Sequence, residues 1–406
     1  MKTKKILQLI FCTFLCLVMT QSFAQKSFQF PLSGTYGKDY IIVNYVDWGI
    51  GASFKDNYCL DKSYNGHQGT DMVIQDFSAM DSGVNVLAVD SGIVIFVQDG
   101  LFDREKVSDT LKGLGNYVGI SHSGKVQTYY AHLKKNSILV SKGDVVLPGQ
   151  KLGQVASSGN SSSPHLHFEL WYDSLYPIDP FSGPCGNINS YWKNEPTFDS
   201  TFNIWKNGIL NFKPNLDTLK EGLASIDTIY KVDSSVATWT LMYGLRKNDS
   251  LTTKWYTPTG NLWFQYSNSL TKNWWHYYYW NYIQTSLFTE EGKWKVTLSR
   301  NGREVQSQNF YYYHKIDTSS TDTTLTAKEF EPTNLLIETH DNIWVVSGLK
   351  SNAELKIRSQ NGQEIDSFKE KDNQIIVNRK RYPNGVYFLV LDTGEKPIVY
   401  KVYNEN

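Results

Sequence analysis

Three short segments of this 406-residue chain, Gly66–Asp71, Tyr130–His132 and Pro164–His167, hold four of its eight histidines and one aspartate. Each histidine by itself would usually be a packed or surface residue. Together they are typical of a hydrolytic zinc site, because zinc favours imidazole nitrogen and carboxylate oxygen and such a site uses three protein ligands. The fold must therefore bring distant segments together.

The last segment predicts a strand that aims its histidines to one side. Within residues 165–170 the odd positions are His, His and Glu, and the even positions are Leu, Phe and Leu. A period of two places His165 and His167 on one face and the apolar side chains on the other. His67 and Asp71 lie four apart, but Gly66 favours a loop there, unlike the helical zinc signature with two histidines.

The pattern along the chain predicts a mainly β protein: an antiparallel β domain followed by two small β-sandwich domains. Residues 25–192 hold short β-rich runs between turns, without a convincing helical period. The turns predict two hairpins, one joining 84–89 to 92–97 and the other joining 117–121 to 126–130.

The remaining segments divide by composition. Residues 195–315 contain most of the tryptophans, and apolar and polar residues alternate around Trp294. This pattern predicts a β-sandwich. Their aromatic run at 273–280 either stacks on sugars or fills the core, and we favour packing. Residues 317–330 are polar and predict a flexible linker, and 331–406 predict a third β unit.

Residues 1–24 resemble an export signal. They combine three early lysines, an apolar run over 6–19 and small residues before Ala24. Their removal leaves 37 basic against 40 acidic residues, from 40 of each in the whole chain, so no nucleic-acid partner is expected. We expect a secreted or cell-surface protein with no membrane span in the mature chain.

Two cysteines, Cys59 and Cys185, remain after the signal. An even pair outside the cytoplasm usually forms a bridge, so we predict a disulfide across the first domain. The alternative is two buried thiols.

A family resemblance covers about residues 60–180. The pattern His-x-x-x-Asp at 67–71, Tyr-Ala-His-Leu at 130–133 and Pro-His-Leu-His-Phe-Glu at 164–169 resembles the lysostaphin-type (LytM-like, M23 family) zinc metallopeptidases. The resemblance implies that His67, Asp71 and His167 bind one zinc ion, and that His132 and His165 are catalytic residues beside it.

The same resemblance implies a metalloendopeptidase that hydrolyses peptide bonds in peptidoglycan cross-links or stems. The alternative function is a cell-surface protein that binds the wall or a polysaccharide, with a catalytically silent peptidase-like domain. The presence of all five expected zinc-binding and catalytic residues argues against a catalytically inactive domain.

Several neighbours of the motifs allow more than one role. We expect His122 to be structural. Glu169 either orients an imidazole or is a solvated strand carboxylate. Tyr64 and Tyr58 are candidates for a position near the reacting carbonyl, and the charged segment 99–114 is expected to form a loop at the rim of the cleft.

The C-terminal unit carries a second resemblance. Residues 384–390 and 401–403 are similar to the sorting domains of the type IX secretion system of Bacteroidota. This implies contact with the secretion machinery. An accessory β-sandwich is the alternative.

Overall fold

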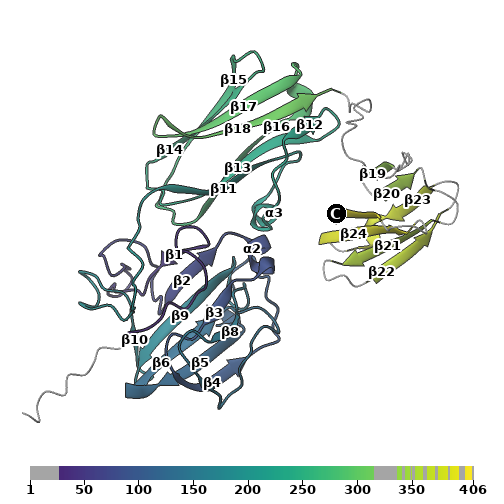
Figure 1. Cartoon of the computed structure of the whole chain (residues 1–406). Coiled ribbons are helices and arrows are strands. Elements are labelled where there is room, and N and C mark those ends of the chain that lie inside the picture. Colours follow the sequence, from purple (N-terminus) through teal and green to yellow (C-terminus); the bar gives the residue numbers. More distant parts are fainter. Residues whose placement is uncertain are drawn as a thin grey trace, which may run out of the picture. The chain divides into compact units, whose positions relative to one another are not determined.

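The computed structural model describes residues 27–314 and, beyond them, 336–340, 343–347, 349, 353–359, 364–370, 374–382, 385–392 and 398–404. The chain is mainly β, as the sequence predicts, and divides into two compact units between Asp317 and Thr318 (Figure 1). The predicted export signal (1–24) and linker (317–330) lie outside the described residues.

An antiparallel sheet forms the first part of the chain, in the strand order β1-β2-β9-β6-β5-β4-β7, with β10 paired to β9. Its strands are β1 (Tyr40–Asn44), β2 (Thr70–Ile74), β4 (Gly92–Gln98), β5 (Tyr117–His122), β6 (Val126–Ala131), β7 (Val145–Val146), β9 (His165–Tyr172) and β10 (Tyr176–Ile178). A two-stranded sheet of β3 (Asn85–Leu87) and β8 (Lys151–Gln154) and the short helix α2 (Phe77–Ser82) accompany it.

One of the two predicted hairpins is confirmed and the other is wrong. β5 pairs with β6 across a tight turn, with His122 opposite Val126. β3, however, pairs with β8 rather than with β4, and places Val86 opposite Gly153. Val86 is fully buried, and an apolar run of this kind identifies a core strand without identifying its partner.

Apolar side chains fix the register between β2 and β9. Met72 lies opposite Leu166, and both are fully buried in one core cluster together with Phe168. A slip by one residue would turn this apolar set toward the other face, so burial determines which side chains meet there. The same register places Asp71 opposite His167.

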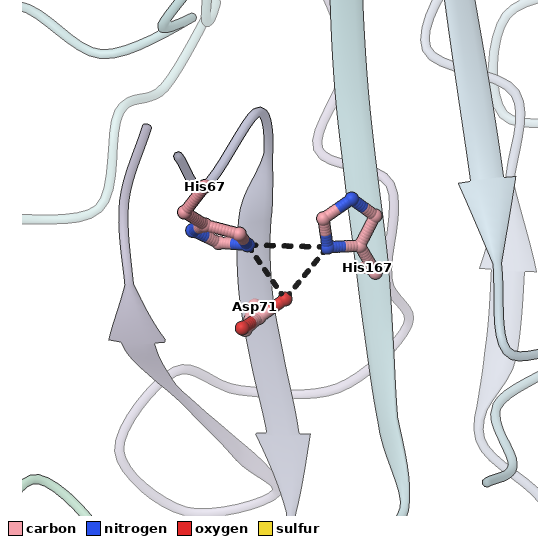
Figure 2. Close-up of side chains that lie close together, drawn as sticks. All are labelled: His67, Asp71 and His167. Carbon is pink, nitrogen blue, oxygen red and sulfur yellow. Dashed lines mark hydrogen bonds and ion pairs between the residues drawn. The ribbon is translucent and has the colours of Figure 1, made fainter. Parts of the chain in front are cut away.

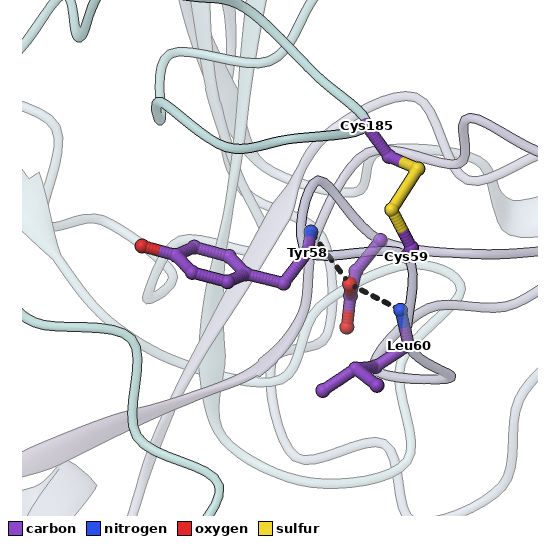
Figure 3. Close-up of a disulfide and its surroundings, with 5 residues drawn as sticks. Tyr58, Cys59, Leu60 and Cys185 are labelled. Carbon is purple, nitrogen blue, oxygen red and sulfur yellow. Dashed lines mark hydrogen bonds between the residues drawn. A yellow bond between two sulfur atoms is a disulfide. The ribbon is translucent and has the colours of Figure 1, made fainter.

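The predicted disulfide is confirmed, since Cys59 and Cys185 are bonded (Figure 3). The loop around Cys59 is tied down by the buried carboxylate of Asp56, which accepts hydrogen bonds from the backbone nitrogens of Tyr58 and Leu60. The bridge thus joins the loop that precedes His67 to the segment after β10.

Two further sheets follow within the first compact unit. One has the order β11-β13-β16 and the other β12-β18-β17-β14-β15. Their elements are β11 (Asn203–Leu210), α3 (Leu216–Lys220), β12 (Thr228–Tyr230), β13 (Ser235–Tyr243), β14 (Ser250–Tyr256), β15 (Leu262–Ser269), β16 (Tyr277–Gln284), β17 (Gly292–Arg300) and β18 (Arg303–Tyr313).

The aromatic side chains of this region mainly fill its core. Trp255, Trp294 and Phe310 are fully buried in one cluster, and Tyr278 and Tyr279 of the 273–280 run are each 7% exposed. Burial supports the packing role that we favoured for these aromatic residues.

The second compact unit contains two small sheets, β19-β20-β23 and β22-β21-β24-β25. Their strands are β19 (Leu336–His340), β20 (Ile343–Ser347), β21 (Glu354–Ser359), β22 (Glu364–Lys369), β23 (Gln374–Asn378), β24 (Gly385–Asp392) and β25 (Ile398–Asn404). The core between them includes Trp344, Leu355 and Leu389, all fully buried. No helix among the described residues has the length and apolar character needed to cross a membrane.

Candidate metal centre

Three predicted ligands come from two neighbouring strands and the loop between β1 and β2. His67 precedes β2, Asp71 is the second residue of β2, and His167 is the third residue of β9. The loop approaches β9 so closely that a Cβ atom on Gly69 would lie 2.6 Å from the carbonyl oxygen of Phe168. Gly69 therefore allows the loop to bring His67 to the other two residues.

The three side chains converge on one point (Figure 2). Asp71 Oδ1 lies 2.8 Å from His167 Nδ1 and 3.2 Å from His67 Nε2, and the two nitrogens are 3.2 Å apart. Ligands bound tetrahedrally at about 2.0–2.1 Å from a zinc ion are separated by roughly 3.3 Å. The spacing and the nitrogen–oxygen donor set both fit zinc.

Hydrogen bonds on the outer side orient both imidazoles. His67 Nδ1 donates to the carbonyl oxygen of Tyr45 at 2.8 Å, and His167 Nε2 donates to Glu169 Oε1 at 3.0 Å. These bonds select the tautomers in which the inner nitrogens carry lone pairs, as metal ligation requires. Glu169 is 8% exposed and also accepts a bond from Trp171, so it orients an imidazole rather than facing solvent.

Both carboxylates of the site, Asp71 and Glu169, are ionised at neutral pH. Burial alone would raise the pKa of Asp71, but His67 and His167 hold it well below its usual range, while Oδ2 accepts a bond from Asn44. Burial likewise opposes ionisation of Glu169, yet its bond to His167 lowers its pKa. Two ionised carboxylates at one buried place favour a divalent cation.

His132 and His165 lie beside this cluster. The two rings are 4.6 Å apart, the ring of His132 is 5.7 Å from that of His167, and His165 Nε2 is 3.7 Å from Asp71 Oδ1. The structure therefore brings together all five residues that the sequence indicates.

Each of these two histidines is held through its Nδ1 atom. His132 donates to the carbonyl oxygen of Ser158 at 2.7 Å, and His165 donates to that of Ser163 at 2.8 Å. Burial lowers the pKa of both rings, so both are neutral at pH 7. Their Nε2 atoms then carry lone pairs that can accept a proton.

A cavity of about 410 Å³ opens beside the centre and is lined by Asp71 and His165. Ser108 and Thr110, from the charged segment 99–114, border it, which confirms that this segment rims the cleft. Tyr64 also lines it and stacks on the ring of His67 at 4.4 Å.

Two other predicted neighbours are structural. Tyr58 stacks instead on Phe198, at 4.2 Å between ring centroids. His122 bonds to the carbonyl oxygen of Ser91 and to Thr128 Oγ1, each at 2.8 Å, which supports the structural role expected for it.

Sequence reasoning missed two residues of the site. Asn44, which supports Asp71, ends β1 and pairs across the sheet with Asp71; no spacing in the sequence signals this role. His276 also lines the cavity, although it lies more than a hundred positions after His167 in the sequence. It stands inside a run of aromatic residues, and nothing in that run indicates a role in the site.

Comparison with known proteins identifies this part of the chain. Residues 65–180 match the model of peptidase family M23. We call residues 65–180 the M23 domain, after the family model that they match. Peptidoglycan DD-endopeptidase ShyA of Vibrio cholerae serotype O1 is 33% identical over 125 residues, which cover 30% of this chain and 25% of that protein.

Another protein and one solved structure are also similar to part of this chain. An uncharacterized metalloprotease of Buchnera aphidicola is 33% identical over 112 residues, covering 28% of this chain and 25% of the relative. A solved structure of a zinc containing peptidase from Vibrio cholerae shares 25% identity and a TM-score of 0.28 and covers 41% of each chain. The chain thus spans about a quarter of the length of the curated relatives it matches.

The M23 domain retains a complete metal site. His67, Asp71 and His167 offer one ligand atom each, all within 4.8 Å of one another, and the site is typical of the zinc peptidases of this family. Zinc is therefore the cofactor of the M23 domain.

Proposed function

We propose that the chain is an exported zinc metalloendopeptidase that hydrolyses peptide bonds in peptidoglycan cross-links or stems. The observation that carries the proposal is the M23 domain with its three ligands in place and two neutral histidines beside them. Similar proteins are named peptidoglycan DD-endopeptidases, which supports the substrate class.

The chain's own residues supply positioning and proton transfer. His67, Asp71 and His167 would hold a zinc ion, and that ion would supply the Lewis acidity that polarises a carbonyl and makes water more acidic. We assign to His132 and His165 the removal of the proton from the attacking water and its delivery to the leaving amine. Both rings are fixed through Nδ1, so each presents Nε2 for these transfers.

Export is part of the same proposal. The Cys59–Cys185 disulfide suits an oxidising compartment outside the cytoplasm, where peptidoglycan lies. The signal-like residues 1–24 point the same way.

Digestion of purified sacculi tests the activity. We expect the mature protein to release peptides from at least one of several peptidoglycan types, and a chelator to abolish the release because the ligands then hold no metal. Mass spectrometry of the products would identify the bond that is cut. Zinc-replete protein that binds sacculi of every type but cuts none would support the alternative, a wall-binding protein.

We propose that residues 331–406 direct the chain to the type IX secretion machinery. The proposal is supported by the resemblance of residues 384–390 and 401–403; of these, 385–390 lie in β24 and 401–403 lie in β25. We expect a variant that ends at Thr326 to accumulate inside cells of a host with this system, as measured by immunoblotting of fractions. Equal export of the truncated and full-length chains would contradict the sorting role.

A further inference from the structure

One wall of the cavity beside the metal centre does not come from the M23 domain. The M23 domain contributes Asp71 and His165, and Tyr64 directly precedes it, whereas His276 lies within the aromatic run and directly precedes β16. A residue of the following β region thus borders the place where a substrate of the proposed peptidase would bind.

Side chains on both sides of His276 are bonded to the segments that precede and follow β2. Trp275 Nε1 donates to the carbonyl oxygen of Asp61 at 3.2 Å, and the Tyr278 hydroxyl donates to that of Gln75 at 3.1 Å. These bonds tie one residue on each side of His276 to the segments before and after β2.

Ring packing and a hydrogen bond from a lysine hold the residues around His276 in place. The His276 ring meets Trp205 and Tyr278 edge-on, at centroid distances of 6.2 and 5.6 Å. Lys220, at the end of α3, donates from Nζ to the carbonyl oxygen of Ser162 at 2.7 Å and so ties α3 to a loop that lines the same cavity. The side chain of His276 is therefore positioned before any substrate arrives.

The hydrogen-bonding capacity of His276 is unused within the described residues. Nε2 is buried and has no hydrogen-bond partner. Burial, with smaller contributions from Lys220 and His165, lowers the pKa of the ring to about 4, so the ring is neutral at pH 7 with one donor and one acceptor nitrogen.

The burial of Nε2 indicates the tautomer. A buried N–H without a partner is rarer and less favourable than an unpaired lone pair, so the proton belongs on Nδ1. Nδ1 then is a free donor, and the structure provides no acceptor for it among the described residues. A ligand in the cavity could supply the oxygen that accepts a hydrogen bond from Nδ1.

We propose that His276 determines substrate specificity by donating a hydrogen bond from Nδ1 to an oxygen of the bound peptide, either a backbone carbonyl or a stem carboxylate. This inference rests on the proposed function. It makes the β region after the M23 domain a part of the substrate cleft rather than a separate attachment.

The experiment compares His276→Ala and His276→Phe with the wild type on a soluble, cross-linked muropeptide dimer. Loss of one neutral hydrogen bond predicts a KM about 3- to 10-fold higher, with kcat nearly unchanged. Calorimetry with chelator-treated protein should show the same rise in Kd, independent of turnover. Phe keeps the ring packing, so it decides the result if the Ala variant melts early.

Two variants serve as controls. His276→Asn places an amide N–H close to the position of Nδ1 and should restore most of the affinity. His314→Ala removes a histidine of the same β region that pairs with Glu291 and does not line the cavity, so KM should stay at the wild-type value.

Dimers with free and amidated stem carboxylates separate the two oxygens. If His276 binds a carboxylate, the penalty of His276→Phe disappears on amidated dimers; if it binds a carbonyl, the penalty is the same on both. A His276→Phe variant with wild-type KM and Kd on both dimers would overturn the inference while leaving the peptidase intact. A wild type that cleaves no peptidoglycan would instead contradict the proposed function.

Discussion

We expect His132→Ala to lower kcat for peptidoglycan hydrolysis by about 10²- to 10⁴-fold, the usual contribution of a general acid or base. The reason is geometric: the bond from Nδ1 to Ser158 points Nε2 of this neutral ring away from its anchor and leaves it free to carry a proton. Because His132 is not among the three converging ligands, the variant should still hold one zinc ion per chain. Steady-state kinetics and elemental analysis of the same sample measure the two quantities.

The matched comparison is His67→Ala, which removes a ligand atom and should lose both the zinc ion and the activity. His165→Ala should behave like His132→Ala. A His132→Ala protein that folds but purifies without zinc would contradict the division into ligands and proton carriers.

The second large effect concerns stability. The double variant Cys59→Ser/Cys185→Ser should lower the free energy of unfolding by about 2–5 kcal/mol, because the bridge closes a loop across a sequence separation of 126 and restricts the unfolded chain. The bonds from Tyr58 and Leu60 to Asp56 would remain, but the loop that leads to His67 would lose its covalent tie (Figure 3).

Urea unfolding of the wild type with and without reductant measures this contribution. Reductant should shift the wild-type midpoint down to that of the double variant and leave the variant itself unchanged. An identical midpoint for oxidised wild type and double variant would show that the bridge contributes nothing to stability.

The sequence predicts the residues of the metal site well because each of them lies in a short motif that can be recognised by itself. A period of two places His165 and His167 on one face of a strand, and the full burial of Leu166 and Phe168 on the other face agrees with this prediction. The choice of ligands among the five residues came from the family resemblance, and the converging ligand atoms agree with it.

The sequence predicts poorly what depends on distant packing. β3 pairs with β8 rather than with β4, the next strand, because several pairings would bury an apolar residue such as Val86. Glu169 could be assigned only when the position of His167 was known. His276 is invisible in the sequence because its role comes from the docking of a separate β region, which no local pattern encodes.

The proposed activity depends most on one zinc ion held by His67, Asp71 and His167. Anomalous scattering at the zinc absorption edge, measured on crystals of metal-replete wild-type protein, tests this directly. We expect a single strong peak among His67 Nε2, Asp71 Oδ1 and His167 Nδ1, with His132 and His165 outside the ligand set. Crystals that contain zinc but show no peak there, with the three side chains directed apart, would contradict the account.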